Sequence, residues 1–146
     1  MPGWVSDAFA EYAKRVRDNC EFKLIEIPAV RRGKNADVKR IARDEGQKLL
    51  AAVPANSRII ALERTGKAIE TETLSKNIQE WMNDGVNASL LVGGPEGLSP
   101  EVLQAADETW SLSAMTLAHP VVRAMVAEQV YRAWSIAQGL PYHRGG

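Results

Sequence analysis

The order of its apolar segments constrains the fold of this chain more than any other feature. Several short apolar runs have the length and residue types of strands: Phe22–Ile27, Arg58–Leu62 and Ser89–Val92. Between and around them, apolar residues recur at helical spacing over four stretches, 5–16, 38–49, 74–82 and 120–138. Trp110–Ser113 is either a further short strand or a loop. This alternation predicts an α/β fold, in which helices cover a largely parallel sheet and ligands bind near the carboxyl ends of the strands.

Length and composition indicate one folded domain spanning residues 1–146. A chain of 146 residues with 45% hydrophobic and 25% charged residues has the size and mix of a folded globular domain. Its 18 basic residues balance its 18 acidic residues, so the total charge does not demand a nucleic-acid partner. Any RNA site is therefore expected to be a local patch.

Several classes of protein are excluded by the same inspection. The single Cys20 cannot form an internal disulfide, and no apolar run approaches the roughly twenty residues needed to span a bilayer. The opening residues lack the pattern of a signal peptide, which predicts a cytoplasmic location. Two histidines and one cysteine do not make a zinc site, so no metal is expected.

The glycine-rich run Gly93-Gly94-Pro95-Glu96-Gly97 follows directly on the apolar run 89–92. Glycines at the end of a strand let the backbone approach a ligand closely, and the free amides can hold a nucleoside or a carboxylate. A tight turn without a ligand explains the same residues equally well. The spacing of the glycines is not that of a dinucleotide-binding loop.

The long apolar helix expected from Pro120 to about Gln138 has apolar residues on more than one face, which predicts an interface between two copies of the chain. Glu128 and Arg132 have the spacing of a helical ion pair, whereas Arg123 has no such partner. The cluster of Arg31, Arg32 and Lys34 suits a phosphate contact, although a solvated turn is the commoner explanation.

Three segments read together carry a resemblance to a known family: residues 90–98, residues 111–120, and residues 130–134 with the closing Tyr142-His143-Arg144. The stretch Arg32–Asp37 adds to it. In this order, over nearly the whole chain, they closely resemble the RlmH-type large-subunit ribosomal RNA pseudouridine N3-methyltransferases of the SPOUT superfamily.

The resemblance implies a C-terminal trefoil knot, a homodimer, the cofactor S-adenosylmethionine and a substrate in large-subunit ribosomal RNA or the assembled ribosome. The residues that it places around the cofactor are Leu62, Gly94, Ser113, Ala114, Met115, Thr116, Leu117 and Ala118. Those that it places at the substrate or in the catalytic site are His119, Arg123, Tyr142, His143 and Arg144. Because the family's tail lies beside the dimer interface, we expect Leu140–Gly146 to complete the cofactor pocket of the partner subunit.

The sequence departs from the family pattern at two places. Ala118 stands where the family usually has proline, which predicts a less rigid loop. The family also opens with a strand and turn of roughly ten residues, whereas this chain begins at the helix. The sheet is therefore expected to lack its first strand. Either translation begins upstream of Met1, or the chain compensates for the loss.

Two functional hypotheses follow. The first is an RNA methyltransferase in which positioning and removal of the N3 proton of a pseudouridine drive methyl transfer. The second is a noncatalytic, ribosome-associated RNA-binding module that keeps the glycine loop without activity. A nucleotide-binding enzyme of other chemistry is disfavoured, because the phosphate-loop and dinucleotide motifs are missing.

Overall fold

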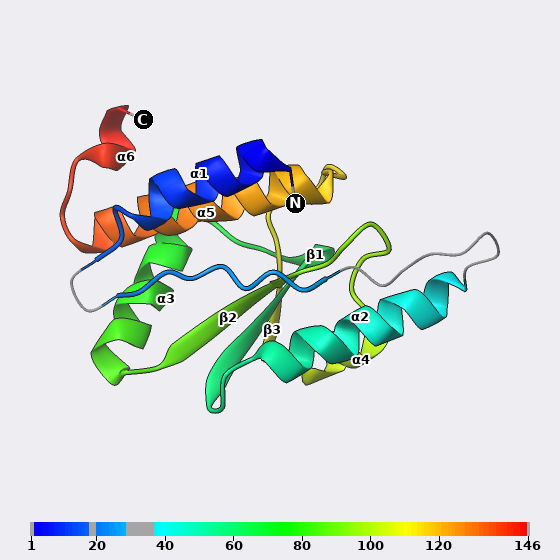
Figure 1. Ribbon diagram of the computed structural model, residues 1–146. Coiled ribbons are helices and arrows are strands. Elements are labelled where there is room, and N and C mark those ends of the chain that lie inside the picture. The colour runs from blue at the N-terminus through cyan, green and yellow to red at the C-terminus, as the bar shows by residue number, and fades with distance from the viewer. Residues whose placement is uncertain (1, 18–19, 29–36, 146) are drawn as a thin grey trace. The chain divides into compact units, whose positions relative to one another are not determined.

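The computed structural model describes residues 2–17, 20–28 and 37–145. The chain divides into two compact units. The sheet unit comprises Ile25–Ala68 and Asn87–His119. The helical unit comprises Met1–Leu24, Ile69–Val86 and Pro120–Gly146. Figure 1 labels the helices and strands of both units.

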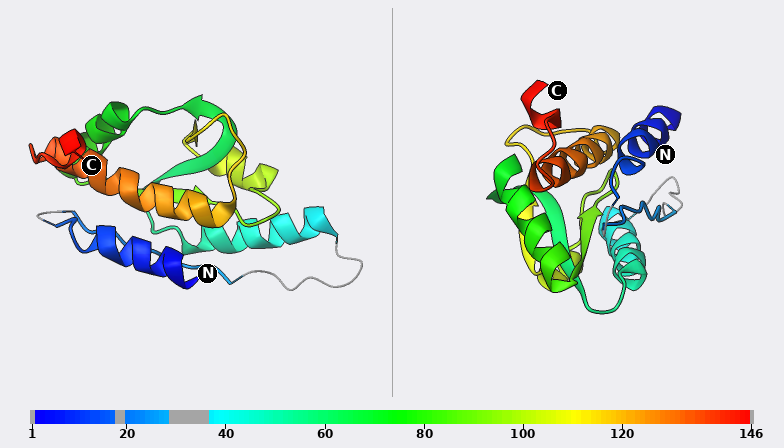
Figure 2. Two further views of the ribbon diagram at one scale, coloured as in Figure 1. Left: turned by 90° about the horizontal axis from the view of Figure 1, so that it is seen from above. Right: turned by 90° about the vertical axis from the view of Figure 1, so that its left-hand side faces the viewer.

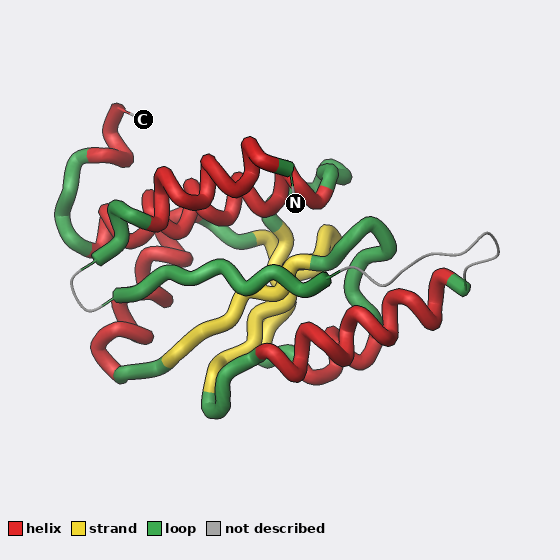
Figure 3. The backbone as a smooth tube through the Cα atoms, viewed as in Figure 1, coloured by secondary structure: helices red, strands yellow, loops and turns green. Residues whose placement is uncertain are grey.

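The sheet unit is built on three parallel strands in the order β2-β1-β3. The central strand β1 (Ser57–Ala68) pairs with β2 (Asn87–Val92) and with β3 (Glu108–Ser111). Ile60 lies opposite Leu90 in β2 and Glu108 in β3, and its side chain is fully buried. The three strands cross the unit together in Figure 3. The predicted parallel sheet is confirmed, and the ambiguous segment 110–113 contributes the end of a strand.

The strand expected at Phe22–Ile27 is absent, so this prediction was wrong. Residues 20–28 form no helix or strand, and Figure 3 draws them as loop. Leu24 and Ile25 are exposed by 42% and 57%. An apolar run becomes a strand only where its backbone groups pair with a neighbour. Among the described residues, the ladders on both sides of β1 are occupied by β2 and β3, and this segment pairs with neither.

Helices α2 (Val38–Ala52) and α4 (Pro100–Ala105) pack against each other in the sheet unit (Figure 1). The Asp37 carboxylate caps α2 by accepting hydrogen bonds from the backbone amides of Lys39 and Arg40. The Ser99 hydroxyl caps α4 by accepting from the amide of Val102 at 3.3 Å, and Pro100 occupies the first turn. The helix start predicted from these residues is confirmed.

The helical unit contains α1 (Gly3–Ala13), α3 (Thr71–Asp84), α5 (His119–Ala137) and α6 (Tyr142–Gly145). Helices α1 and α5 run side by side in both views of Figure 2, and the rings of Tyr12 and Tyr131 lie 6.0 Å apart between them. The Thr71 hydroxyl donates to Gln129 at 2.7 Å and so joins α3 to α5. Gly85 ends α3 with φ of +66°, as its position predicted.

Candidate functional site

The glycine run after β2 forms a tight turn. The amide of Gly97 donates to the carbonyl of Gly94 at 2.9 Å, with Pro95 at the second position, where its fixed φ suits a turn. Gly97 has φ of +76°, a conformation that favours glycine. The turn expected as the alternative to a ligand loop is therefore present, and it accounts for Gly97.

Gly93 and Gly94 differ in what surrounds them. A Cβ atom at Gly93 would lie 2.7 Å from the carbonyl carbon of Gly97, so the fold itself excludes a side chain there. A Cβ atom at Gly94 would meet within 4 Å only the carboxylate of Glu45, at 3.2 Å. The φ of Gly94 is not positive. Neither the turn nor the packing of the described residues therefore requires glycine at position 94.

The glycine loop begins where β2 ends, level with Leu62 in β1. Leu62 lies opposite Val92 in β2 and Trp110 in β3, and β1 then continues through an irregular stretch to Ala68, which lies opposite Ser111. The residues that follow Val92 and Trp110 are the glycine loop and the segment from Ser111 onward. The candidate cofactor residues are therefore grouped toward the carboxyl ends of the strands, where parallel α/β sheets bind ligands.

The segment from Ser113 to Ala118 leaves β3 through local hydrogen bonds. The Ser111 hydroxyl donates to the carbonyl of Ser113 at 2.9 Å, and the Ser113 hydroxyl accepts from the amide of Met115 at 3.0 Å. Ala114, Met115, Thr116 and Ala118 are exposed, and Leu117 is half-buried. Exposed small residues leave the main chain of such a segment accessible to a ligand.

The candidate substrate and catalytic residues lie in α5 and α6. His119 is the first residue of α5, and Arg123 follows one turn later on the same face. No described carboxylate pairs with Arg123, in agreement with the sequence. His143 and Arg144 are exposed on α6, and Tyr142 is half-buried. Residues 142–145 form the short helix α6.

Tyr142 is anchored to α5. Its hydroxyl donates to Glu128 Oε2 at 2.9 Å, and its ring meets that of Tyr131 edge-on with centroids 4.5 Å apart. Burial above all, and then the hydrogen bond donated to Glu128, raise the pKa of the Tyr142 phenol far above its usual value. The predicted ion pair of Glu128 with Arg132 is confirmed, at 2.7 Å.

Sequence inspection missed two acidic residues near these sites. Glu45 points from α2 toward Gly94, and Glu128 holds Tyr142. The spacing of Glu128 and Arg132 predicted their ion pair, but it did not predict the hydrogen bond between Glu128 and Tyr142, which lies fourteen residues further along the chain. For Glu45 no sequence signal existed. Arg31, Arg32 and Lys34 lie outside the described residues.

In the ranges 2–17, 20–28 and 37–145, no three histidine, cysteine, aspartate or glutamate side chains are grouped so that they could hold a metal ion. None of the helices in these ranges is both long enough and apolar enough to cross a membrane.

A parallel sheet with a glycine turn and an exposed segment at one edge is typical of an α/β protein that binds ligands at its strand ends. A family model described as "Predicted SPOUT methyltransferase" matches residues 1–143. The chain belongs to the SPOUT methyltransferase family, and the resemblance drawn from its sequence is confirmed.

A relative gives the resemblance more detail. The chain is 51% identical over 144 residues to "Ribosomal RNA large subunit methyltransferase H" of Thioalkalivibrio sulfidiphilus (strain HL-EbGR7). The alignment covers 99% of this chain and 92% of the relative. A noncatalytic module has no support from either comparison, and the chain is a methyltransferase.

Proposed function

We propose that this protein transfers a methyl group from S-adenosylmethionine to N3 of a pseudouridine in large-subunit ribosomal RNA. The name of the relative supports the class of RNA. The observation that supports a ligand at the strand ends is the glycine at position 94, which neither the turn nor the packing of the described residues requires. A cofactor lying against this backbone would explain the glycine, because a side chain at position 94 would occupy the space of the cofactor.

The residues at this edge fit S-adenosylmethionine. Leu62, Gly94 and the segment 113–118 offer apolar surface and main-chain groups, which suit an adenosine. Bound there, the cofactor supplies an activated methyl group on a positively charged sulfur. The Glu45 carboxylate beside Gly94 adds a negative charge that favours a positively charged ligand.

Transfer to N3 requires removal of a proton, because the protonated imide nitrogen is a poor nucleophile. Tyr142 is unsuited to this role, since its raised pKa keeps the phenol protonated. The imidazole side chains of the histidines suit proton transfer at neutral pH. We assign this role to His119 or His143, and the binding of RNA phosphates to Arg123 and Arg144.

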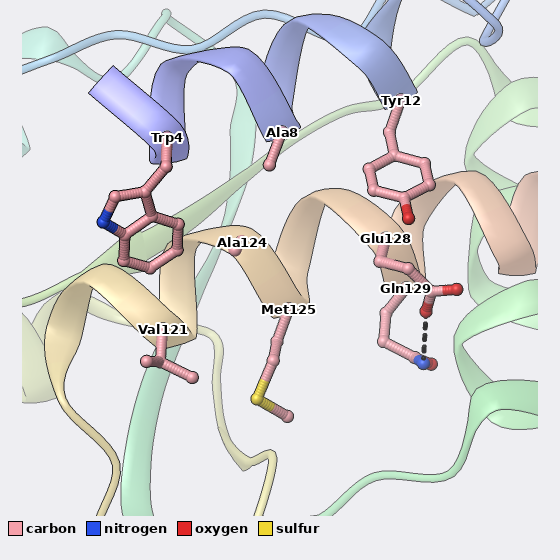
Figure 4. Close-up of a pocket in the computed structure, with 8 residues that line it drawn as sticks. All are labelled: Trp4, Ala8, Tyr12, Val121, Ala124, Met125, Glu128 and Gln129. Atoms are coloured by element: carbon pink, nitrogen blue, oxygen red, sulfur yellow. Dashed lines mark hydrogen bonds between the residues drawn. The ribbon is translucent and has the colours of Figure 1, made fainter. Parts of the chain in front are cut away.

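The proposed enzyme is a homodimer with a C-terminal knot, joined through α1 and α5. A groove of about 350 Å³ lies between these helices. Figure 4 shows Trp4 and Ala8 of α1 pointing toward α5, whose Val121 and Met125 also line the groove. Trp4 is 53% exposed and Val121 is 40% exposed. A second copy covering this surface would bury the apolar side chains that one chain leaves in water.

In this dimer the tail serves the partner subunit's cofactor pocket. The support is that Tyr142 fixes the tail to its own α5 while His143 and Arg144 remain exposed. Dimers mixed from a tail-truncated chain and a Gly94→Val chain then assemble one intact pocket and regain part of the wild-type activity. An inactive mixture, with heterodimers confirmed by native mass spectrometry, would exclude the shared pocket.

The test of the main proposal is methylation of ribosomal particles with labelled S-adenosylmethionine, followed by mass spectrometric mapping of the product. The expected result is label at N3 of one pseudouridine in large-subunit RNA. Absence of transfer to any large-subunit RNA would overturn it. Calorimetry of folded protein checks the cofactor separately, because a protein that does not bind S-adenosylmethionine cannot use it.

A further inference from the structure

The C-terminal tail meets α5 at a cluster of three polar and aromatic side chains. Glu128 accepts hydrogen bonds from both sides with the same oxygen: from Tyr142 Oη at 2.9 Å and from Arg132 Nη2 at 2.7 Å. Arg132 Nε donates a further bond to this oxygen at 3.1 Å. One carboxylate therefore links a residue of the tail to the helix before it.

Arg132 completes the cluster from the other side. Its guanidinium lies over the Tyr142 ring, 4.9 Å from the centroid, in the geometry of a cation–π contact. The side chains of Arg132 and Glu128 are only 20% and 22% exposed. A charge pair of limited exposure is screened less by solvent than a surface pair, and here it also fills the space beside the tyrosine ring.

Besides this cluster, the tail is held by the edge-on contact of the Tyr142 ring with Tyr131 and by the turn that follows α5. Helix α6 has four residues, too few to be stable alone. After α5 the chain turns through Gly139, whose φ is +74°, and the amide of Leu140 donates to the carbonyl of Ser135 at 2.8 Å. Tyr142 is the first tail residue beyond this turn with a side chain bonded to α5. The direction of the following residues depends on that bond.

We propose that Glu128 is a positioning residue for methyl transfer, which fixes Tyr142 on α5 and thereby aims His143 and Arg144 at the substrate. This inference rests on the proposed function of the tail. Glu128 touches neither cofactor nor RNA in this role. It acts through the tyrosine, and its carboxylate is oriented for that purpose by Arg132.

The test compares Glu128→Ala, Glu128→Gln and the wild-type protein on ribosomal particles. Removal of the carboxylate frees the tail, so Glu128→Ala should lower kcat about tenfold to a hundredfold, the scale that misplacement of reacting groups produces. KM for the RNA should rise as well, because the same contact directs Arg144. The calorimetric affinity for S-adenosylmethionine should change least, since Leu62, Gly94 and the segment 113–118 stay in place. Glu128→Gln retains an acceptor for the phenol and should recover part of kcat.

A second readout does not depend on activity. Hydrogen exchange of the backbone amides in residues 140–145 should be faster in Glu128→Ala than in the wild-type protein. Tyr142→Phe removes only the hydroxyl and should accelerate the same amides. The double variant should lose no more kcat than Glu128→Ala alone, because both changes break one contact.

Asp44→Ala is the matched control. Asp44 pairs with Arg40 on α2 at the same helical spacing, and no contact between it and the tail is found among the described residues. It should leave kcat and tail exchange unchanged, while a thermal melt checks that every variant is folded.

The outcomes distinguish a failure of the proposed function from a failure of the positioning role of Glu128. An inactive wild-type protein overturns the proposed function and this inference with it. An active wild-type protein together with an unimpaired Glu128→Ala variant, or with unchanged tail exchange, overturns this inference alone.

Discussion

The carboxylate of Glu45 lies 3.2 Å from the position that a Cβ atom would occupy at Gly94. The two residues come from α2 and from the turn after β2, and they approach each other at the strand ends. Gly46, the next residue of α2, is buried against Ser99 and Val102, so the packing of α2 on α4 fixes the direction of its neighbour. An acidic group thus faces exposed backbone at the candidate cofactor site.

A side chain at Gly94 should block the cofactor and spare the fold. In Gly94→Val the added Cβ atom meets only the flexible end of Glu45, so the melting temperature should stay near that of the wild-type protein. Calorimetry should detect no binding of S-adenosylmethionine. Normal binding would show that the loop only turns the chain.

Gly93→Val provides the contrast. Its Cβ atom would overlap the main chain of Gly97 at 2.7 Å, where no side chain can move aside. This variant should lose stability by about 1–3 kcal/mol, the usual cost of overpacking. Equal melting temperatures for the two valine variants would contradict the difference between the two sites.

Removal of the Glu45 charge should weaken the cofactor without disturbing the fold. At surface-like distances a charge contributes about 1 kcal/mol, so Glu45→Gln should raise the Kd for S-adenosylmethionine roughly fivefold. Added salt should shrink the difference between variant and wild-type protein. Identical affinities at low salt would mean that this carboxylate does not face the ligand.

The sequence predicted those features that depend on neighbours along the chain. Ser99 and Pro100 predicted the start of α4, and Gly85 predicted the end of α3. Both could be predicted because a helix cap depends on residues next to the helix end in the sequence. The run 58–62 predicted β1, which nevertheless continues to Ala68 through an irregular register after Leu62. The local sequence pattern does not show that the strand continues beyond this irregularity.

Features that depend on distant partners were not predictable in the same way. Phe22–Ile27 has the composition of a strand, but whether it pairs is decided by other segments. The same applies to the hydrogen bond between Tyr142 and Glu128, because the turn at Gly139 brings the tail back to α5. The cofactor residues could be named only because the family resemblance supplied them, since exposed small residues have no signature of their own.

The contact between α2 and α4 should not tolerate a larger residue at Gly46. In Gly46→Ala the methyl group would lie 2.9 Å from Val102 Cγ2 and would also strike the buried Ser99 hydroxyl. Alanine favours helices by about 1 kcal/mol over glycine, but the overlap costs about 1–3 kcal/mol. Urea denaturation should show a net loss of stability. A stabilised variant would mean that the helices separate readily.

A charge on the exposed part of α5 should prevent dimerisation. Val121→Glu places a carboxylate in the apolar groove beside α1, where a second copy would have to desolvate it. Sedimentation should show a monomer for this variant and a dimer for the wild-type protein. Val86→Glu, at a valine 37% exposed outside the groove, is the matched control and should remain dimeric. A monomeric wild-type protein would refute the proposed interface.

The final prediction concerns the pH dependence of the tail contact. Burial, followed by the hydrogen bonds with Glu128 and Tyr12, raises the pKa of Tyr142 above the ordinary value of about 10. Deprotonation would place a phenolate beside the Glu128 carboxylate, and Arg132 can balance only part of this charge. Because the pKa in the folded state is the higher one, the contact contributes fully below the ordinary pKa of tyrosine. It is lost as the pH rises through the raised value.

Ultraviolet absorbance of tyrosinate measures this directly. The difference between the titrations of the wild-type protein and Tyr142→Phe isolates one group, and its midpoint should lie above that of free tyrosine. In Glu128→Gln the midpoint should fall only part of the way, since burial is the larger cause and remains. Exchange of the amides in residues 140–145 should accelerate over the same pH range, beyond the intrinsic rise of exchange with pH that Tyr142→Phe reports. A Tyr142 that titrates like free tyrosine would show that the phenol is in water and that the tail is not held on α5.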